Sequence, residues 1–329
     1  RFEDPAFVNP ECIMIWGKAP LASNPDGFFG HAVVDMMRRG ARLIVVDPRD
    51  IGLAAHADIH LKLRPGTNVA FANGIVNYLI QHELYDEDFV RERTEGFEIL
   101  AATVRDYTPE LVEDICGIDR RDLVAAAKMY AAADAAAIMY CLGVTEHSTG
   151  TDGVMALSNI AMISGNLGKP GGGVNPLRGQ NNVQGSCDMG MWPSLYPGYQ
   201  RVSDPAVRAK FAAAWGVDEE RLSLKEGFKL TDLPHGVAEG TIRAFYNFGE
   251  DPLQTEPDTA QMRATLEGLD LLISQDIFMT QTTALADVVL PATSWAEHDA
   301  VYTASDRSFQ RTTAALPPKG ECRHDWEIF

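Results

Sequence analysis

A polar, glycine-rich segment at residues 175–190 contains the side chain best suited to hold a small anion. It reads NPLRGQNNVQGSCDMG and has one arginine, six amide or carboxyl side chains and three glycines. So little apolar material cannot build a core, so the segment is either a solvated loop or the wall of a pocket. In the second case Arg178 would face an anion, because a guanidinium forms two parallel hydrogen bonds to a carboxylate. A structural ion pair within the loop is the simpler alternative.

The chain before this segment follows a strand–helix–strand order. Residues 12–16 and 42–46 are predicted buried strands, and residues 28–39 between them favour a helix. This order predicts a parallel sheet, in which ligands bind beyond the carboxyl ends of the strands. Gly17 and the Asp47-Pro48-Arg49 turn stand at those ends.

The same alternation of strands and helices continues along the chain. Further strands are predicted at 59–63, 136–141, 244–248, 271–274 and 288–291, with helices near 67–81, 86–93, 97–104, 119–132, 152–165, 205–215 and 259–268. The predicted fold class is therefore α/β, with two doubly wound, mostly parallel-sheet domains at residues 1–200 and 201–329.

Six loops that follow predicted strands contain glycine, acidic or amide residues: Gly17, Asp47/Arg49, Gly66/Asn68, Gly143, Gly249/Asp251 and Gln275/Asp276. A single aspartate of this kind is usually a helix N-cap. Six such loops favour a nucleotide-type ligand, because a strand-end carboxylate accepts hydrogen bonds from ribose hydroxyls or a guanine edge. Neither G-x-G-x-x-G nor G-x-x-x-x-G-K-[ST] occurs, so a simple dinucleotide or ATP site lacks its fingerprint.

Two stretches resemble a known family. They are GVTEHSTGTDGVMALSNIAMISGNLGKPGGGVNPLRGQNNVQGSCDMG, which begins at Gly143, and YPGYQ, which ends at Gln200. Both resemble the molybdopterin-dependent formate dehydrogenases of the dimethyl-sulfoxide-reductase superfamily, and the resemblance extends less densely over nearly the whole chain. It implies two α/β domains of the molybdopterin oxidoreductase type.

The resemblance also implies a ligand: a molybdenum or tungsten atom between two pterin guanine dinucleotides, one held mainly by each domain. Arg178 matches the arginine that orients formate, with Gln180 in the same pocket wall. The other implied cofactor-binding residues are Gly17, Asp47, Arg49, Gly66 and Asn68 for the first nucleotide, Leu142, Gly143 and Glu146 near the pterin, and Gly249, Glu250, Asp251, Thr255, Gln275, Asp276 and Asp325 for the second nucleotide. Formate is the implied substrate, and electrons would leave through a 4Fe-4S cluster to an electron-transfer subunit or iron–sulfur protein.

The amino-acid composition limits the kinds of partner that this chain is expected to bind. A net charge of −18 argues against nucleic acid, since phosphate binding needs a basic face. No apolar run reaches the ~18 residues of a membrane helix, so no membrane contact is predicted. The five cysteines are dispersed and form no C-x-x-C, which favours a reducing, cytoplasmic compartment over a disulfide framework.

The same cysteines lack the close spacing of an iron–sulfur site. The chain begins with Arg1, and we interpret it as an internal piece of a longer polypeptide. The family's cluster-binding cysteines and its cysteine or selenocysteine metal ligand would lie upstream. No metal ligand is therefore expected in this chain, and it is predicted to be inactive by itself.

Two other functions stay open at this stage. Ala19 stands where many relatives have an asparagine, which weakens the match at the first nucleotide and leaves room for a same-superfamily enzyme with another substrate. The second alternative is a structural electron-transfer subunit without cofactor. The Arg178 segment argues against cofactor loss, because an empty pocket has no need of an arginine. His147, near the pterin loop, is interpreted as a structural residue rather than a proton shuttle.

Overall fold

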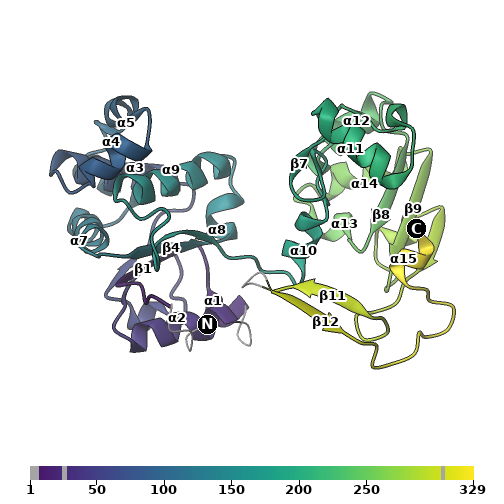
Figure 1. Ribbon diagram of the computed structural model, residues 1–329, viewed down its shortest axis with the longest axis horizontal. Coiled ribbons are helices and arrows are strands. Elements are labelled where there is room, and N and C mark those ends of the chain that lie inside the picture. Colours follow the sequence, from purple (N-terminus) through teal and green to yellow (C-terminus); the bar gives the residue numbers. More distant parts are fainter. Residues whose placement is uncertain (1–6, 24–27, 305–307) are drawn as a thin grey trace. The chain divides into compact units, whose positions relative to one another are not determined.

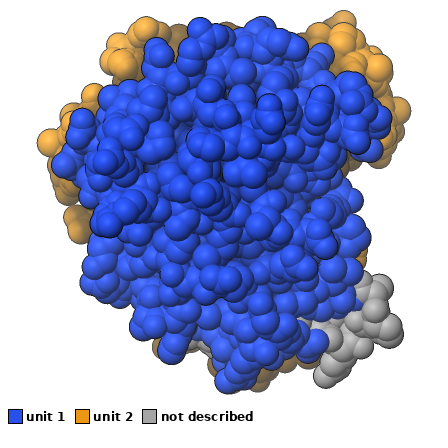
Figure 2. All heavy atoms as spheres, turned by 90° about the vertical axis from the view of Figure 1, so that its left-hand side faces the viewer, with its two compact units in different colours: residues 1–179 blue, residues 180–329 orange. Residues whose placement is uncertain are grey.

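The computed structural model describes residues 7–23, 28–304 and 308–329 (Figure 1). The chain forms two compact units, residues 1–179 and 180–329 (Figure 2). The division therefore falls earlier than the expected boundary at residues 200/201. Residues 180–200 belong with the second unit, where the backbone N–H of Thr303 donates to Asn182 Oδ1 at 3.0 Å.

Unit 1 is built on a five-stranded parallel sheet in the order β3-β2-β1-β4-β5. The strands are β1 (Cys12–Trp16), β2 (Arg42–Val46), β3 (Ile59–Leu61), β4 (Ala136–Tyr140) and β5 (Gly173–Pro176). In the central strand β1, Met14 pairs with Ile44 of β2 and Ile138 of β4. All five residues of β1 are buried, as expected for a continuous apolar run inside a parallel sheet.

Helices cover both faces of this sheet (Figure 1). They are α1 (Pro20–Ser23), α2 (Phe28–Arg38), α3 (Asn68–Gln81), α4 (Glu87–Arg93), α5 (Phe97–Val104), α6 (Pro109–Cys116), α7 (Arg120–Ala131), α8 (Leu142–Thr145) and α9 (Gly150–Ile163), with a 3-10 turn η1 (Ala54–His56). Ile13 and Ile15 pack in one core cluster with Val33 of α2, whereas Met14 belongs to the cluster of Phe71 in α3. Successive strand residues thus fill two separate cores. The predicted doubly wound α/β organisation is confirmed here.

Unit 2 contains a smaller parallel sheet in the order β10-β9-β8. The strands are β8 (Ala244–Phe248), β9 (Leu271–Asp276) and β10 (Val288–Pro291). One face packs on a cluster of Leu233, Leu253, Met262, Leu266 and Leu272. On the other face the ring of Phe329 lies 5.5 Å from the ring of Tyr246. The predicted parallel α/β character is confirmed for this unit too.

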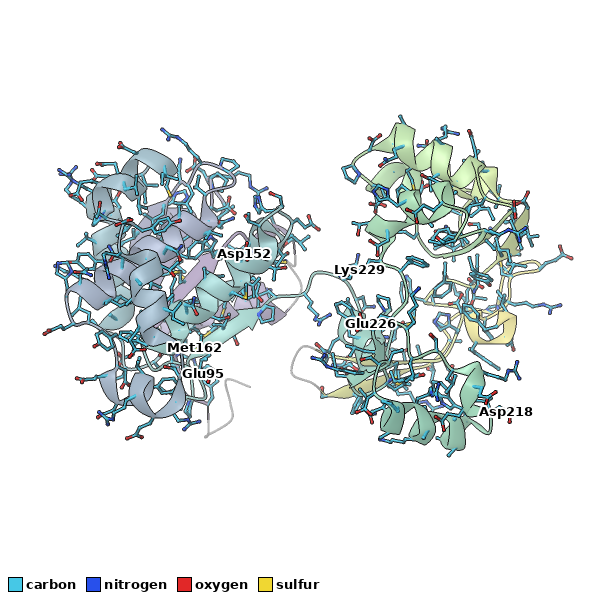
Figure 3. All side chains as sticks on the ribbon, turned by 90° about the horizontal axis from the view of Figure 1, so that it is seen from above. Glu95, Asp152, Met162, Asp218, Glu226 and Lys229 are labelled. Carbon is cyan, nitrogen blue, oxygen red and sulfur yellow. The ribbon has the colours of Figure 1, made fainter. Side chains whose placement is uncertain are left out.

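The other elements of unit 2 are short. The helices are α10 (Val183–Asp188), α11 (Pro205–Trp215), α12 (Leu233–Ala238), α13 (Pro252–Thr255), α14 (Thr259–Glu267) and α15 (Asp325–Ile328), with 3-10 turns η2 (Glu219–Arg221), η3 (Leu230–Asp232) and η4 (Thr283–Leu285). Antiparallel pairs join β6 (Leu195–Tyr196) to β7 (Gln200–Arg201) and β11 (Ala300–Thr303) to β12 (Phe309–Thr312). An irregular loop between η2 and η3 carries the exposed side chains of Glu226 and Lys229 (Figure 3). Within the described ranges, no helix has both the length and the apolar character needed to cross a bilayer.

Candidate cofactor site

A pocket of about 560 Å³ opens in unit 1 beyond the carboxyl ends of β1, β2 and β4. Its lining includes six of the residues predicted for the first nucleotide and the pterin: Gly17, Asp47, Arg49, Asn68, Leu142 and Gly143. The other two, Gly66 and Glu146, are exposed and lie next to the lining residues Pro65 and His147. The fold therefore brings together side chains from four separate parts of the sequence at one sheet edge.

Two glycines set the floor of this pocket. Gly17 has a φ of +59°, and a Cβ built on it would lie 2.7 Å from the Cα of Gly143. The backbone N–H of Gly143 donates to the carbonyl of Gly17 at 3.1 Å. Only residues without a side chain permit this contact, which joins the end of β1 to the start of α8.

Asn68 stabilises the same junction between β1 and α8. Its Oδ1 accepts a hydrogen bond from Trp16 Nε1 at 2.7 Å, and its Nδ2 donates to the carbonyl of Gly143 at 3.2 Å. Both ends of the amide are thus used inside the protein. Asn68, predicted from the sequence as a ligand residue, holds β1, α3 and α8 together.

Asp47 occupies the end of β2 and is only 3% exposed. Its Oδ1 accepts from the backbone N–H of Arg49 at 2.9 Å and from Arg49 Nε at 3.3 Å. The Arg49 side chain itself is largely exposed. The turn therefore keeps a buried carboxylate and a reachable guanidinium at one pocket wall.

Sequence reasoning missed two further cationic residues of the pocket, Lys18 and Arg64. Lys18 lies in the loop after β1, where a lysine is usually exposed, yet it is only 5% exposed. Its place immediately after a buried strand was the available signal. With Arg49, these residues give the described lining three basic side chains against one acidic side chain, Asp47. In a chain of net charge −18, such a local excess of positive charge suits phosphate groups.

His147 also lines the pocket, and its Nε2 lies 3.0 Å from the carbonyl of Gly143. This contact ties α8 to the following turn.

Arg178 lies just beyond the carboxyl end of β5 and is half-buried. The preceding Leu177 is buried, and its N–H donates to the carbonyl of Tyr140 at 2.8 Å. Burial also raises the pKa of the Tyr140 side chain, so the hydroxyl group of this tyrosine stays neutral. Arg178 thus follows an anchored strand at the same sheet edge as the pocket, whereas Gln180 is exposed and begins unit 2.

The first residues of unit 2 contain a polar cluster that sequence reasoning did not identify. Asp188 Oδ1 accepts from Gln184 Nε2 at 2.7 Å and from the Tyr199 hydroxyl at 3.0 Å. Tyr199 has a φ of +61°, which is strained for a residue with a large side chain. Burial and the Asp188 carboxylate raise the pKa of Tyr199, so it acts as a donor here.

The residues predicted for the second nucleotide lie at the carboxyl ends of β8 and β9 and on α13 and α15. Three contacts link them: Gly249 N to the carbonyl of Gln275 at 2.9 Å, Thr255 Oγ1 to Glu250 Oε1 at 2.9 Å, and Gln275 Nε2 to Asp325 Oδ1 at 2.7 Å. Asp251 and Asp276 instead accept from backbone groups: Asp251 from the N–H of Thr282 at 3.0 Å, far along the chain, and Asp276 from the N–H of Phe278 at 2.8 Å, two residues on. Sequence reasoning placed these residues at one edge but could not distinguish structural acceptors from ligand-facing ones.

Comparison with known proteins agrees with this architecture. The molybdopterin oxidoreductase family model matches residues 7–329. The chain is 49% identical over 320 residues to formate dehydrogenase H of Escherichia coli, covering 97% of this chain and 44% of that protein. It is 43% identical over 318 residues to the F420-dependent formate dehydrogenase 1 subunit alpha of Methanococcus maripaludis, covering 97% and 46%, respectively.

The chain thus spans about half the length of these relatives. Among solved structures, the acetylene hydratase of Pelobacter acetylenicus superposes with a TM-score of 0.77 at 24% identity, over 98% of this chain and 46% of that one, which shows a shared fold. The family match over nearly the whole chain confirms the resemblance seen in the sequence: the chain belongs to the molybdopterin oxidoreductase family.

Proposed function

We propose that this chain is the central part of a formate dehydrogenase catalytic subunit. The whole enzyme would oxidise formate to carbon dioxide, releasing one proton and two electrons. The observation that carries the proposal is the cationic pocket at the carboxyl edge of the first sheet, which gathers six residues expected at the first nucleotide and the pterin. The names of the relatives support formate as substrate.

The residues fit a molybdenum or tungsten bis(pterin guanine dinucleotide). Gly17 and Gly143 meet at this pocket in a contact that leaves no room for a Cβ on either residue. Lys18, Arg49 and Arg64 in the lining would supply positive charge for a pyrophosphate. Gly17, Asp47 and Arg49 would lie around one nucleotide, and Gly249, Glu250 and Asp325 around the other, while Asn68 and Asp251 hold the neighbouring backbone in place. When bound, the group supplies a metal that accepts the two electrons of formate.

The contribution of this chain to the reaction is orientation. Formate is a one-carbon anion whose C–H must face the oxidant. Arg178 would hold both carboxylate oxygens through two hydrogen bonds from its planar guanidinium. A lysine in its place would hold the charge but not the orientation.

The electrons would leave through a 4Fe-4S cluster toward an electron-transfer subunit or iron–sulfur protein, with cluster and metal ligands outside these residues. Accordingly, the 329-residue chain alone should show no formate oxidation. The test is the longer polypeptide assayed with formate and a viologen dye, together with metal and guanine analysis. Turnover of another substrate but not formate would overturn the proposed substrate, and a protein without metal and guanine would overturn the enzyme assignment.

A further inference from the structure

A chain of side-chain hydrogen bonds in unit 2 runs from Tyr246 through Gln275 to Asp325. Tyr246 lies in the middle of β8, Gln275 near the end of β9, and Asp325 at the start of α15. The Tyr246 hydroxyl donates to Gln275 Oε1. Gln275 Nε2 in turn donates to Asp325 Oδ1 at 2.7 Å. Two strands and a short helix distant in sequence are thereby connected.

Gln275 has no surface for a ligand to contact. It is 0% exposed and sits in the central strand, paired with Phe248 on one side and Leu290 on the other. Its carbonyl also accepts from the N–H of Gly249 at 2.9 Å. The resemblance implied that Gln275 binds the cofactor, but a fully enclosed side chain can act only through its neighbours.

The chemistry of these groups fixes which one donates and which one accepts in each of the two hydrogen bonds. An ionised carboxylate only accepts hydrogen bonds, so Gln275 must turn its NH₂ group toward Asp325. Its carbonyl oxygen then faces Tyr246, and the tyrosine hydroxyl must donate. Removing that hydroxyl leaves a buried acceptor without its partner and frees the amide to rotate.

Tyr246 also supports the same short helix through its ring. The ring of Phe329 lies 5.5 Å from Tyr246 and 5.4 Å from Phe248. The N–H of Phe329 donates to the carbonyl of Asp325 at 3.2 Å. The hydroxyl and the ring of Tyr246 thus act on α15 separately, and a phenylalanine would remove only the first effect.

We propose that Tyr246 and Gln275 are positioning residues that aim the Asp325 carboxylate at a guanine base. This rests on the proposed function, which places a guanine nucleotide at this edge. A carboxylate pairs with guanine through both N1–H and the 2-amino group. Hypoxanthine lacks the 2-amino group, so an oriented carboxylate discriminates between the two bases. Selectivity for guanine then depends on the orientation of Asp325. That orientation is set by the hydrogen bonds from Tyr246 to Gln275 and from Gln275 to Asp325, which we call the relay.

The test compares GDP with IDP on the 329-residue chain by hydrogen–deuterium exchange. Peptides covering residues 322–329 report binding at this edge apart from the pocket of unit 1. We expect the wild type to bind GDP about 10-fold more tightly than IDP, the value of one well-formed hydrogen bond, and Asp325→Ala to remove that preference. Tyr246→Phe should weaken GDP binding about 3- to 10-fold and IDP binding less, which lowers the GDP/IDP ratio.

Tyr85→Phe, in unit 1, is the matched control and should leave the ratio unchanged. If Tyr246→Phe does not fold, Gln275→Met removes the relay by a second route. A wild-type ratio in Tyr246→Phe, or equal weakening of both nucleotides, would overturn the relay while Asp325→Ala still identifies the guanine site. A wild-type chain that does not distinguish GDP from IDP would overturn the guanine site and the relay together.

Discussion

Gly17 and Gly143 approach so closely that neither tolerates a side chain. A Cβ on Gly143 would lie 2.6 Å from the Cα of Gly17, and the reverse substitution meets Gly143 at 2.7 Å. Both contacts are with backbone atoms, which cannot rotate away. This pair therefore joins the ends of β1 and β4 directly at the floor of the pocket.

Gly143→Ala should consequently force β1 and α8 apart. We expect a loss of about 1–3 kcal/mol in the free energy of unfolding, as for other overpacked sites, measured by urea denaturation. Guanine nucleotide binding to unit 1 should fall in parallel. Gly179→Ala is the control, since a Cβ there meets nothing within 4 Å. Equal stability of the two variants would show that the glycine contact is not a constraint.

Asp251 has a structural role that can be separated from ligand binding. Its Oδ1 accepts from the backbone N–H of Thr282 at 3.0 Å and from Thr282 Oγ1 at 2.7 Å, and Thr282 is fully buried. Asp251→Ala leaves both donors without a partner, at a cost of about 1–3 kcal/mol in unfolding free energy.

Asp251→Asn keeps a side-chain oxygen at the same place and should recover most of that stability in urea denaturation. If aspartate, asparagine and alanine were equally stable, the anchoring role would be wrong, and ligand contact would be the better explanation for an acid at this position.

Because the thiol of Cys12 is buried, we expect the protein to lose stability at alkaline pH. Burial raises its pKa from 9.0 to about 12. The folded state therefore keeps the proton where the unfolded chain releases it. The stabilising effect is complete below pH 9 and disappears as the pH rises toward 12.

Cys12→Ala should flatten the fall in unfolding free energy between pH 9 and pH 11 relative to wild type, measured by chemical denaturation at each pH. Cys322→Ala, at a partly exposed thiol, is the control and should retain the wild-type slope. Parallel curves for wild type and Cys12→Ala would exclude the buried thiol as the cause.

Strands buried on both faces were predictable because they read as continuous apolar runs, and the edge where their loops gather followed from parallel topology. Strand β5 was not predicted. It lies at the sheet edge, where polar side chains are tolerated, and Asn175 Nδ2 donates to the carbonyl of Ile138 at 3.3 Å. Its polar composition therefore resembled a loop. Helix α6 was also missed, although Thr108 caps it by accepting from Leu111 N at 3.3 Å and Pro109 follows directly.

Within the site, residue types indicated which loops matter but not how each side chain is used. Asn68 and Gln275 have the composition of ligand residues, yet their amides are engaged inside the protein. Lys18 reads as an ordinary loop lysine and is buried. Such assignments depend on long-range contacts, from β1 to α3 and from β9 to α15, that local sequence patterns do not encode.

Arg178→Lys in the longer polypeptide separates charge from orientation. If the guanidinium holds both oxygens of formate, lysine keeps the attraction but loses the paired hydrogen bonds, so kcat/KM for formate should fall about 10- to 100-fold. Cofactor content, measured as metal and guanine, should stay at the wild-type level. Lys169→Arg, in the turn before β5, is a control of the same charge. An Arg178→Lys enzyme with wild-type kcat/KM would refute the orienting role, because a point charge would then suffice to place a one-carbon anion.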